Sequence, residues 1–484
     1  MRLACSLLRN SLIRRSSTLP AQARRNSRCF KSGFVTQRFV SFSLMAESEA
    51  SPINRLSWLR SSYSFLNATA ASPNARWLVS NGPQQLVSVP ASSTSAKPTI
   101  AQLTTEQVKS VLGPAPYFGQ GKDDGRVLTE QETSPFTESA RHRGPRIVFL
   151  GLLDSLSTLN ALPTSDFADP ERAVANLKGI PYFAVDISEL NVDTEEILKQ
   201  DKDAQILSWM EARGLLMTLQ LDNVGLALLN EARSMVDWNQ RNKFCPACGS
   251  STYSMWGGWK ISCSTLLPWA DNTGRKPCVT AKGLHNFTHP RTDPVVIMIA
   301  IDETGDKILL GRGKRYPGKF YSALAGFIEP GETFEEAVVR EMWEEAGVKA
   351  WNVTYHSAQP WPFPANLMVG FYARADATQP IRLDLDNELM DARWYTRNEI
   401  LEVLNHKLGT RIVASDQKKF AENADKASHE AVSAVEAKPA VEPVVDEPPF
   451  RVPPTSAIAG VLIRDWAYKK IQFPTTPVVQ KGNL

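Results

Sequence analysis

Three glutamates stand at helical spacing in the C-terminal half of the 484-residue chain, at Glu341, Glu344 and Glu345. Side chains at i, i+3 and i+4 share one helix face, so these carboxylates would form a cluster. Like charges at this spacing destabilise a bare helix, and a cation is expected to offset them. Mg²⁺ prefers carboxylate oxygens and commonly shares them with substrate phosphates. The alternative is a solvated acidic face with no ligand.

The helix that must position these carboxylates is predicted to follow Thr333, a favourable N-cap, and to end at Gly347, a favourable C-cap. Its apolar residues recur at i, i+4 and i+8 and can face a core; they are Val338, Met342 and Ala346. Arg340 lies next to the cluster, where its guanidinium can orient one carboxylate through a bidentate pair.

The stretch from Gly326 to Val348, GFIEPGETFEEAVVREMWEEAGV, resembles the Nudix box, G-x5-E-x7-R-E-U-x-E-E-x-G-U, where U is a bulky apolar residue. Every fixed position of that pattern is matched. The resemblance implies an α+β fold in which helices sandwich a mixed sheet. It also implies Mg²⁺-dependent hydrolysis of a nucleoside diphosphate linked to another group.

Four of the six cysteines form a second constellation, with the spacing C-x2-C-x14-C-x14-C. A C-x2-C knuckle followed by glycine lets two thiolates reach one tetrahedral ion, and two more would complete a structural zinc site of four cysteines. The predicted ligands are Cys245, Cys248, Cys263 and Cys278. Because the last gap is long, His285 or His289 is an alternative to Cys278. Four buried cysteines without a metal are the other possibility.

A third feature alternates proline with aromatic residues, from Gln359 to Pro364. Each proline fixes its own φ and restricts the residue before it, so the segment is expected to be stiff and extended. Its two aromatic faces could stack on a base or on nicotinamide. A rigid structural turn is the alternative when the loop is considered alone.

The longer segment AQPWPFPAN, from Ala358 to Asn366, resembles the SQPWPFPxS signature of the NADH pyrophosphatase branch of the Nudix family. Ala358 and Asn366 replace the two serines of that signature. The resemblance covers roughly residues 51–415 and 448–470, including the cysteine ribbon and PPTSAIAGVLI, and is greatest to fungal members.

The resemblance implies the site residues by position. About two or three Mg²⁺ or Mn²⁺ ions would be held by Glu341, Glu344, Glu345, Glu388 and the carbonyl of Ala325, with Glu344 as the candidate base. The catalytic set also includes Arg340. The substrate would be lined by Phe327, Gln359, Pro360, Trp361, Pro362, Phe363, Pro364, Ala365, Asn366, Ala459 and His289, the last standing where relatives often carry Tyr.

The expected reaction is hydrolysis of NADH or NAD⁺ to AMP and (reduced) nicotinamide mononucleotide. Removal of NAD caps from RNA 5′ ends would need the same chemistry and is the alternative. An inactive nucleotide sensor is a third hypothesis, against which the intact box argues. The resemblance further implies a homodimer.

Composition is that of a globular protein, with 43% apolar and 22% charged residues. The formal net charge of +3 is unevenly distributed, because residues 1–46 hold nine Lys/Arg and no Asp or Glu. The rest of the chain is therefore acidic and gives no overall basic signal for nucleic acid. No apolar run approaches the roughly 20 residues that span a bilayer, so no membrane association is expected.

Six segments are predicted. They are a targeting-like segment (1–44), an N-terminal α+β domain (51–242), the zinc ribbon (243–290), the Nudix domain (293–415), a disordered insertion (416–447) and a C-terminal segment that completes the Nudix domain (448–484). Within the second segment, 146–155 and 181–188 are predicted strands, 204–238 a broken helix, and 91–143 long loops.

The cellular location is left open between peroxisome and mitochondrion, with cytoplasm as a further possibility. Residues 1–44 have the Arg- and Ser-rich, acid-free composition of a mitochondrial transit peptide. An over-extended gene model with Met45 as the working start is the alternative. The tripeptide Gly482-Asn483-Leu484 shares only its leucine with the peroxisomal S-K-L signal.

Overall fold

The structure is a computed structural model that describes residues 53–90, 97–120, 139–153, 165–193, 197, 205–218, 221–266, 274, 276, 278, 289–314, 316, 318–385, 388–412 and 447–471. Segment 1–44, nearly all of 416–447, and His285 lie outside these residues, so the predictions made for them stay predictions. The described strands form three sheets of seven, six and two strands.

The N-terminal sheet has the order β1-β5-β6-β2-β3-β4, with β7 also paired to β3. Its strands are β1 (Ile53–Asn54), β2 (Arg76–Asn81), β3 (Gln84–Pro90), β4 (Thr99–Ile100), β5 (Ile147–Leu153), β6 (Ile180–Asp186) and β7 (Gln205–Glu211). The pairing of β2 with β6 is parallel, and the other pairings are antiparallel. The two strands predicted at 146–155 and 181–188 are therefore confirmed as β5 and β6.

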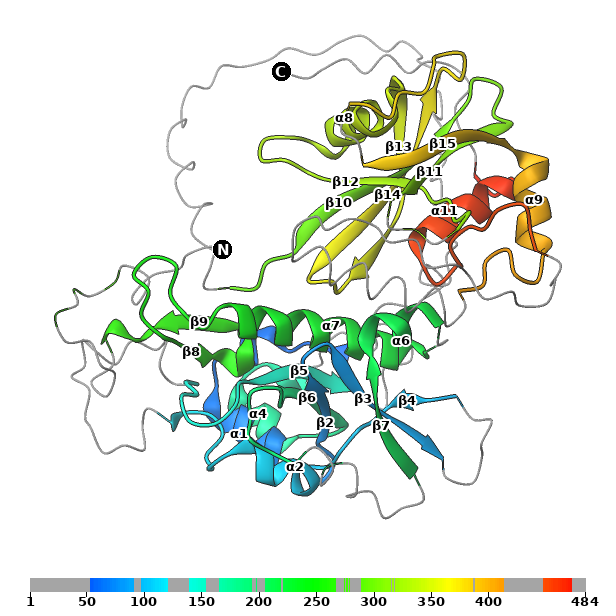
Figure 1. Cartoon of the computed structure of the whole chain (residues 1–484). Coiled ribbons are helices and arrows are strands. Elements are labelled where there is room, and N and C mark those ends of the chain that lie inside the picture. Colours follow the sequence, from blue (N-terminus) through cyan, green and yellow to red (C-terminus); the bar gives the residue numbers. More distant parts are fainter. Residues whose placement is uncertain are drawn as a thin grey trace, which may run out of the picture. The chain divides into compact units, whose positions relative to one another are not determined.

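Helices cover both faces of this sheet (Figure 1). One buried cluster joins it to α1 (Tyr63–Ala71), α2 (Thr105–Leu112) and α4 (Pro170–Ala175). The other joins it to α6 (Ala212–Thr218) and α7 (Asn223–Arg241). The segment is thus α+β, as expected.

Two local predictions in this segment are wrong. The residues of β7 were expected to start a helix, but they pair along the whole of β3, from Gln205 opposite Pro90 to Glu211 opposite Gln84. A non-local ladder overrides local propensity there. The stretch 91–143, expected as loops, contains α2, which begins with a capping box between Thr104 and Gln107.

The two-stranded sheet is a hairpin of β8 (Thr252–Met255) and β9 (Lys260–Cys263). It begins shortly after the Cys245/Cys248 knuckle and places Cys263 at its far end. The hairpin thus brings a third cysteine toward the first two.

The C-terminal sheet has the order β13-β14-β10-β11-β15, with β12 also paired to β10. Its strands are β10 (Asp293–Ile301), β11 (Lys307–Gly313), β12 (Leu324–Phe327), β13 (Ala350–Trp361), β14 (Asn366–Ala375) and β15 (Leu389–Thr396). β10 and β14 are parallel over nine residue pairs, whereas the remaining pairings are antiparallel. The sheet is mixed, as predicted.

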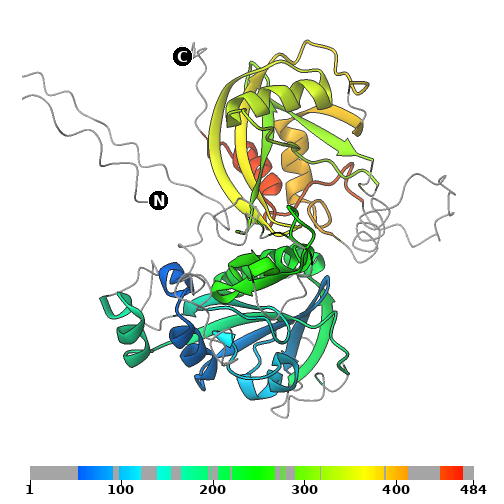
Figure 2. The same ribbon diagram turned by 90° about the vertical axis from the view of Figure 1, so that its left-hand side faces the viewer.

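Helices sandwich this sheet (Figures 1 and 2). On one face, α8 (Phe334–Ala346) buries its apolar stripe with Val296, Met298 and Phe371. On the other, α9 (Arg397–Asn405) and α11 (Ile458–Ala467) pack on Ile299, Leu310 and Tyr372. The predicted sandwich is confirmed, and residues after position 447 supply α11, one of its covering helices.

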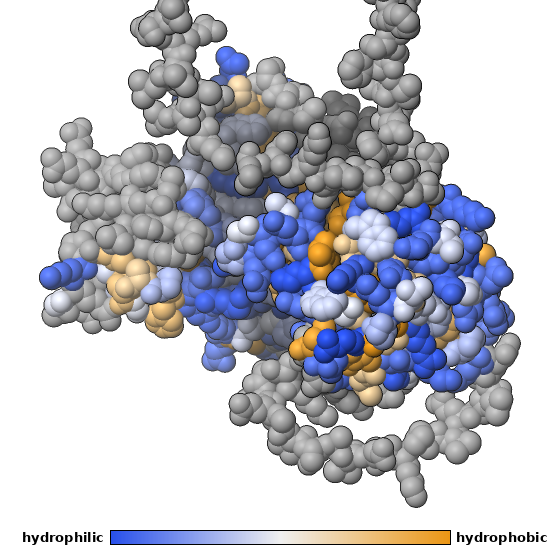
Figure 3. Space-filling model, turned by 90° about the horizontal axis from the view of Figure 1, so that it is seen from above, coloured by the Kyte–Doolittle hydropathy of each residue, from blue (hydrophilic) through white to orange (hydrophobic). Residues whose placement is uncertain are grey.

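Among the residues coloured in Figure 3, hydrophilic ones predominate, with smaller hydrophobic areas between them. Among the described helices, none combines the length and apolar character needed to cross a bilayer.

Candidate functional site

The helix α8 forms where its local signals predict it. Thr333 accepts a hydrogen bond from the N–H of Glu336, and the Glu336 side chain accepts one from the Thr333 N–H at 2.8 Å, which completes a capping box. Gly347 ends the helix in the left-handed conformation, at φ 66°. Val338, Met342 and Ala346 are fully buried. The carboxylate-bearing face is thereby fixed relative to the sheet.

Two of the three carboxylates are held against β12. The Glu341 carboxylate lies on Gly326, where a Cβ would come within 1.8 Å of Glu341 Cδ. Glu345 is 4% exposed, and its Oε1 accepts a hydrogen bond from the Ala325 N–H at 3.1 Å. Glu344 is more exposed. The sequence therefore placed all three on one helix face, and the structure adds that β12 approaches two of them through its backbone.

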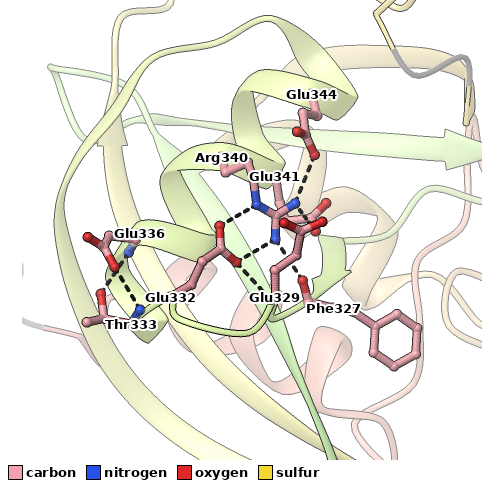
Figure 4. Close-up of polar contacts among 8 residues, drawn as sticks. All are labelled: Phe327, Glu329, Glu332, Thr333, Glu336, Arg340, Glu341 and Glu344. Atoms are coloured by element: carbon pink, nitrogen blue, oxygen red, sulfur yellow. Dashed lines mark hydrogen bonds and ion pairs between the residues drawn. The ribbon is translucent and has the colours of Figure 1, made fainter.

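Arg340 ties this helix to the preceding loop (Figure 4). Its guanidinium forms a bidentate pair with Glu332, at 2.6 and 2.9 Å, and donates to the Phe327 carbonyl at 2.8 Å. Its remaining nitrogen, Nη1, donates to Glu341 at 2.7 Å and to Glu344 at 2.9 Å. The bidentate pair predicted for Arg340 thus exists, but its partner is Glu332 and not a member of the carboxylate cluster.

The charges around Arg340 perturb the neighbouring carboxyl groups in opposite directions. The hydrogen bonds from Arg340 and from the Glu329 N–H lower the pKa of Glu332 to about 2. Burial raises the pKa of Glu341, Arg340 opposes that rise, and the charges of Glu344 and Glu388 add to it. Glu388, which directly precedes β15, is thus close enough to Glu341 to interact with it electrostatically.

Glu341, Glu344, Glu345 and Glu388 all offer carboxylate oxygens, which are the donor atoms that hard divalent cations prefer. Glu341 and Glu344 each give one oxygen to Arg340 and retain a second for an ion. The buried Glu345 holds its own orientation through the Ala325 N–H. A divalent cation held by these carboxylates would neutralise charge on a diphosphate.

The aromatic segment runs from the end of β13 into β14. Trp361 and Phe363 pack edge to face with ring centroids 5.4 Å apart. The Asn366 amide donates to the Phe363 carbonyl at 3.4 Å, and the Ala365 carbonyl accepts from the Asp293 N–H at 3.0 Å. Pro362 is buried, whereas Pro360 is exposed. The segment is extended only as far as Trp361, and residues 362–365 form the turn that joins β13 to β14, so the prediction of a wholly extended segment is wrong and the alternative of a structural turn describes this part.

Other predicted substrate residues differ in accessibility. Phe327 is 57% exposed, and its ring points away from Arg340 (Figure 4). Ala459 is buried in the first turn of α11. The Gln359 side chain is also buried, and its amide bonds to the backbone just before and at the start of α11.

The four predicted zinc ligands come together. Their sulfur atoms all lie within 4.8 Å of one another, with 3.8 Å between Cys245 and Cys278 and 3.4 Å between Cys248 and Cys263. Four thiolates bound to one tetrahedral zinc at about 2.3 Å have sulfurs about 3.8 Å apart. Gly249, at φ 72°, turns the chain after the knuckle and donates to the Cys245 carbonyl at 2.7 Å. The donor set and its spacing fit zinc, with Cys278 in the fourth position.

His289, an alternative ligand and a predicted substrate contact, packs its ring against Trp256 at 5.6 Å. Burial and the charge of Lys260 lower its pKa. The four cysteine sulfurs that lie within 4.8 Å of one another form a group that does not include His289.

Sequence reasoning missed two functional details. It did not assign Glu332 a partner, although an acidic residue at a fixed distance before Arg340 was a visible signal. It gave no reason for glycine at position 326, which the approach of Glu341 now supplies.

A family profile described as NUDIX domain matches residues 291–415. The chain is 47% identical over 186 residues to the human NAD-capped RNA hydrolase NUDT12, covering 38% of each chain. It is 46% identical over 173 residues to the NAD-capped RNA hydrolase of Schizosaccharomyces pombe, covering 36% of this chain and 45% of that one. It is 33% identical over 271 residues to the NAD-capped RNA hydrolase NPY1 of Saccharomyces cerevisiae, covering 55% of this chain and 66% of that one. The matches to the human and fission-yeast proteins thus span less than half of their length.

Proposed function

This chain is a Nudix-domain protein, and from that premise we propose that it hydrolyses the diphosphate bond of NADH or NAD⁺, releasing AMP and (reduced) nicotinamide mononucleotide. The observation that carries the proposal is the gathering of Glu341, Glu344 and Glu345 on one face of α8, with Glu388 close enough to interact with Glu341 electrostatically. The sequence similarity to proteins named NAD-capped RNA hydrolases supports an NAD-linked substrate.

Each residue has a proposed part in this reaction. Glu341, Glu344, Glu345, Glu388 and the Ala325 carbonyl would hold Mg²⁺ or Mn²⁺, which supplies charge neutralisation at phosphorus and acidifies water. Arg340 fixes the orientation of Glu341 and Glu344 by hydrogen bonds. Glu344, the most exposed of the three helix carboxylates, takes the proton of the attacking water.

Residues outside α8 would select the substrate. Trp361 and Phe363 offer aromatic faces for a base or nicotinamide ring, and the exposed Phe327 ring offers another. Asn366, whose amide donates to Phe363, replaces the last serine of the signature. Ala459 would contribute its backbone, and His289 would contact substrate from outside the Nudix sheet.

The test is hydrolysis of NADH by the purified full chain in Mg²⁺, with AMP and reduced nicotinamide mononucleotide identified by chromatography. Glu345→Gln should lower kcat by about a hundredfold or more with an unchanged Tm. The exposed Glu106→Gln in α2 is the matched control and should leave kcat unchanged. Intact NADH after incubation with the wild-type chain would refute the proposal.

The second candidate activity is removal of NAD caps from RNA 5′ ends, favoured by the names of the relatives. This reaction would use the same carboxylates. Its substrate differs because an RNA chain follows the adenosine. Comparing kcat/KM for NADH, NAD⁺ and an NAD-capped RNA on one preparation decides which substrate is preferred. Tight NADH binding with no hydrolysis of any of the three would instead indicate a nucleotide sensor.

We also propose a structural zinc ion at Cys245, Cys248, Cys263 and Cys278, supported by the sulfur spacing. A homodimer is proposed from the family resemblance, and a solution mass of one subunit would contradict it. The proposed location is the peroxisome or the mitochondrion, with the cytoplasm as the alternative. Imaging the chain with a tag at either end distinguishes the three.

A further inference from the structure

The Gln359 side chain connects two segments that lie far apart in the sequence. Its Nε2 donates to the Ser456 carbonyl at 2.8 Å, and its Oε1 accepts from the Ile458 N–H at 2.7 Å. These bonds span 97 and 99 positions of the chain. The residue is 2% exposed, so both bonds are shielded from water. A buried amide with donor and acceptor both satisfied is costly to disrupt.

The start of α11 depends on this amide. Its N-cap is Ala457, which has no side-chain acceptor for the first turn. Helices normally satisfy such N–H groups with a local Ser, Thr, Asp or Asn. Here the Ile458 N–H is satisfied by a residue of β13 instead. The helix terminus is therefore attached to the strand that leads into the aromatic loop.

The surrounding backbone leaves little room for this terminus to shift. A Cβ on Gly370 of β14 would lie 2.9 Å from Ile458 Cδ1. A Cβ on Gly460 would lie 2.2 Å from the Pro454 carbonyl oxygen. The Tyr372 hydroxyl of β14 donates to the Leu462 carbonyl at 2.8 Å. Figure 1 shows α11 beside α9, and its buried residues pack with Tyr372 of β14.

The positions of the aromatic rings in the loop depend on the position of Gln359. Gln359 pairs with Met368 in the β13–β14 ladder, and Pro360 follows it directly. Because prolines at 360, 362 and 364 fix their own φ angles, the segment cannot absorb a shift of Gln359 by local rotation. A displacement at Gln359 would therefore move Trp361 and Phe363 relative to Ala459.

We propose that Gln359 is a positioning residue, which sets the placement of the aromatic loop against α11 instead of contacting the substrate with its side chain. This inference rests on the proposed hydrolysis of an NAD-type substrate, because it assigns the loop to substrate binding. The apolar stripe of α8 packs on the opposite face of the sheet from α11, so the two amide bonds are made on the other side of the sheet from that stripe. Loss of the amide is therefore expected to raise KM and to leave kcat nearly unchanged.

The test compares Gln359→Met with the wild-type chain and with Gln205→Met, a control at an exposed glutamine of β7. The Met variant keeps the length of the side chain and removes both hydrogen bonds. We expect KM for NADH to rise about tenfold and kcat to stay within about twofold, with faster hydrogen exchange at the Ile458 amide. An unchanged KM, or a fall in kcat at unchanged KM, overturns the proposal.

The double variant Gln359→Met/Ala457→Ser separates positioning from helix capping. The introduced serine is a local cap and should restore slow exchange in the first turn of α11. KM should stay raised, because both hydrogen bonds between the Gln359 side chain and the start of α11 are still missing. If KM returned to the wild-type value together with slow exchange, Gln359 would act only as a cap of α11. That result would overturn its positioning role.

A different experimental result would show that the proposed function itself is wrong. If the wild-type chain does not hydrolyse NADH, that function falls. The exchange rate at Ile458 in Gln359→Met then tests the attachment of α11 alone: faster exchange supports that attachment, and unchanged exchange overturns it.

Discussion

The carboxylate of Glu341 lies against the backbone of Gly326, with no space for a side chain between them. A Cβ at position 326 would be 1.8 Å from Glu341 Cδ and 2.1 Å from both carboxylate oxygens. The position therefore needs glycine because of a helix residue fifteen positions away. This contact joins the start of the box, in β12, to its carboxylate cluster in α8.

Gly326→Ala is expected to displace Glu341 while the chain still folds. A shift of about 1 Å in a catalytic group costs on the order of a hundredfold in rate, so kcat for NADH should fall by about that factor. Gly313→Ala is the matched control, because a Cβ there would meet no atom within 4 Å. Equal activity of the two variants would show that the placement of Glu341 does not limit catalysis.

Arg340→Lys keeps the positive charge and removes the planar fork. Lysine cannot reproduce the bidentate pair with Glu332 while also reaching the Phe327 carbonyl. We expect kcat to fall by about tenfold or more, with a small decrease in Tm. Arg241→Lys, at an exposed arginine of α7 that pairs with Asp237, serves as the control. Wild-type kcat in Arg340→Lys would mean that charge alone suffices.

Cys245→Ser should remove the proposed zinc and destabilise the protein without a direct effect on the carboxylate site. A loss of about 2 kcal/mol would lower Tm by roughly 4–8 °C in a domain of this size. Zinc content by mass spectrometry should fall from one ion per chain to none. Cys29→Ser, outside the cluster, should change neither quantity. Retained zinc in Cys245→Ser would contradict the site.

The buried Glu231 of α7 is expected to make the free energy of unfolding depend on pH. Burial raises its pKa to about 7, and the charges of Arg55, at 3.2 Å, and of Arg60 oppose the shift. The folded state therefore binds a proton more tightly than the unfolded state, whose carboxyl titrates near 4.5. This contribution to stability is complete below pH 4.5 and is lost as pH rises to about 7.

Urea unfolding between about pH 4 and pH 8 measures that contribution. Glu231→Gln should remove the component of the slope between about pH 4.5 and pH 7. Glu106→Gln, at an exposed glutamate of α2, should leave the slope as in wild type. Parallel pH profiles for wild type and Glu231→Gln would show that Glu231 does not titrate in this window.

Local sequence signals were sufficient to predict the helix α8 but not the strand β7. The cap at Thr333, the stop at Gly347 and the apolar stripe are all contained within the helix itself, and each is observed. The helix α2 was also signalled, by the Thr104/Gln107 capping box, but the composition around it favoured a loop. The strand β7 owes its conformation to β3, more than a hundred residues earlier, so no local pattern could identify it.

The sequence by itself placed Glu341, Glu344 and Glu345 on one helix face through their spacing, and its resemblance to the Nudix box predicted the sandwich fold that the structure shows. It also predicted four cysteine ligands but left Cys278 open against His285 or His289, and the gathering of the four sulfurs in the structure favours Cys278. Only the tertiary structure decided the partner of each side chain: Glu332 for Arg340, the backbone of Gly326 for Glu341, and α11 for Gln359. The physical reason is that helical periodicity sets the direction of a side chain, whereas its partner depends on which distant backbone the packing brings alongside.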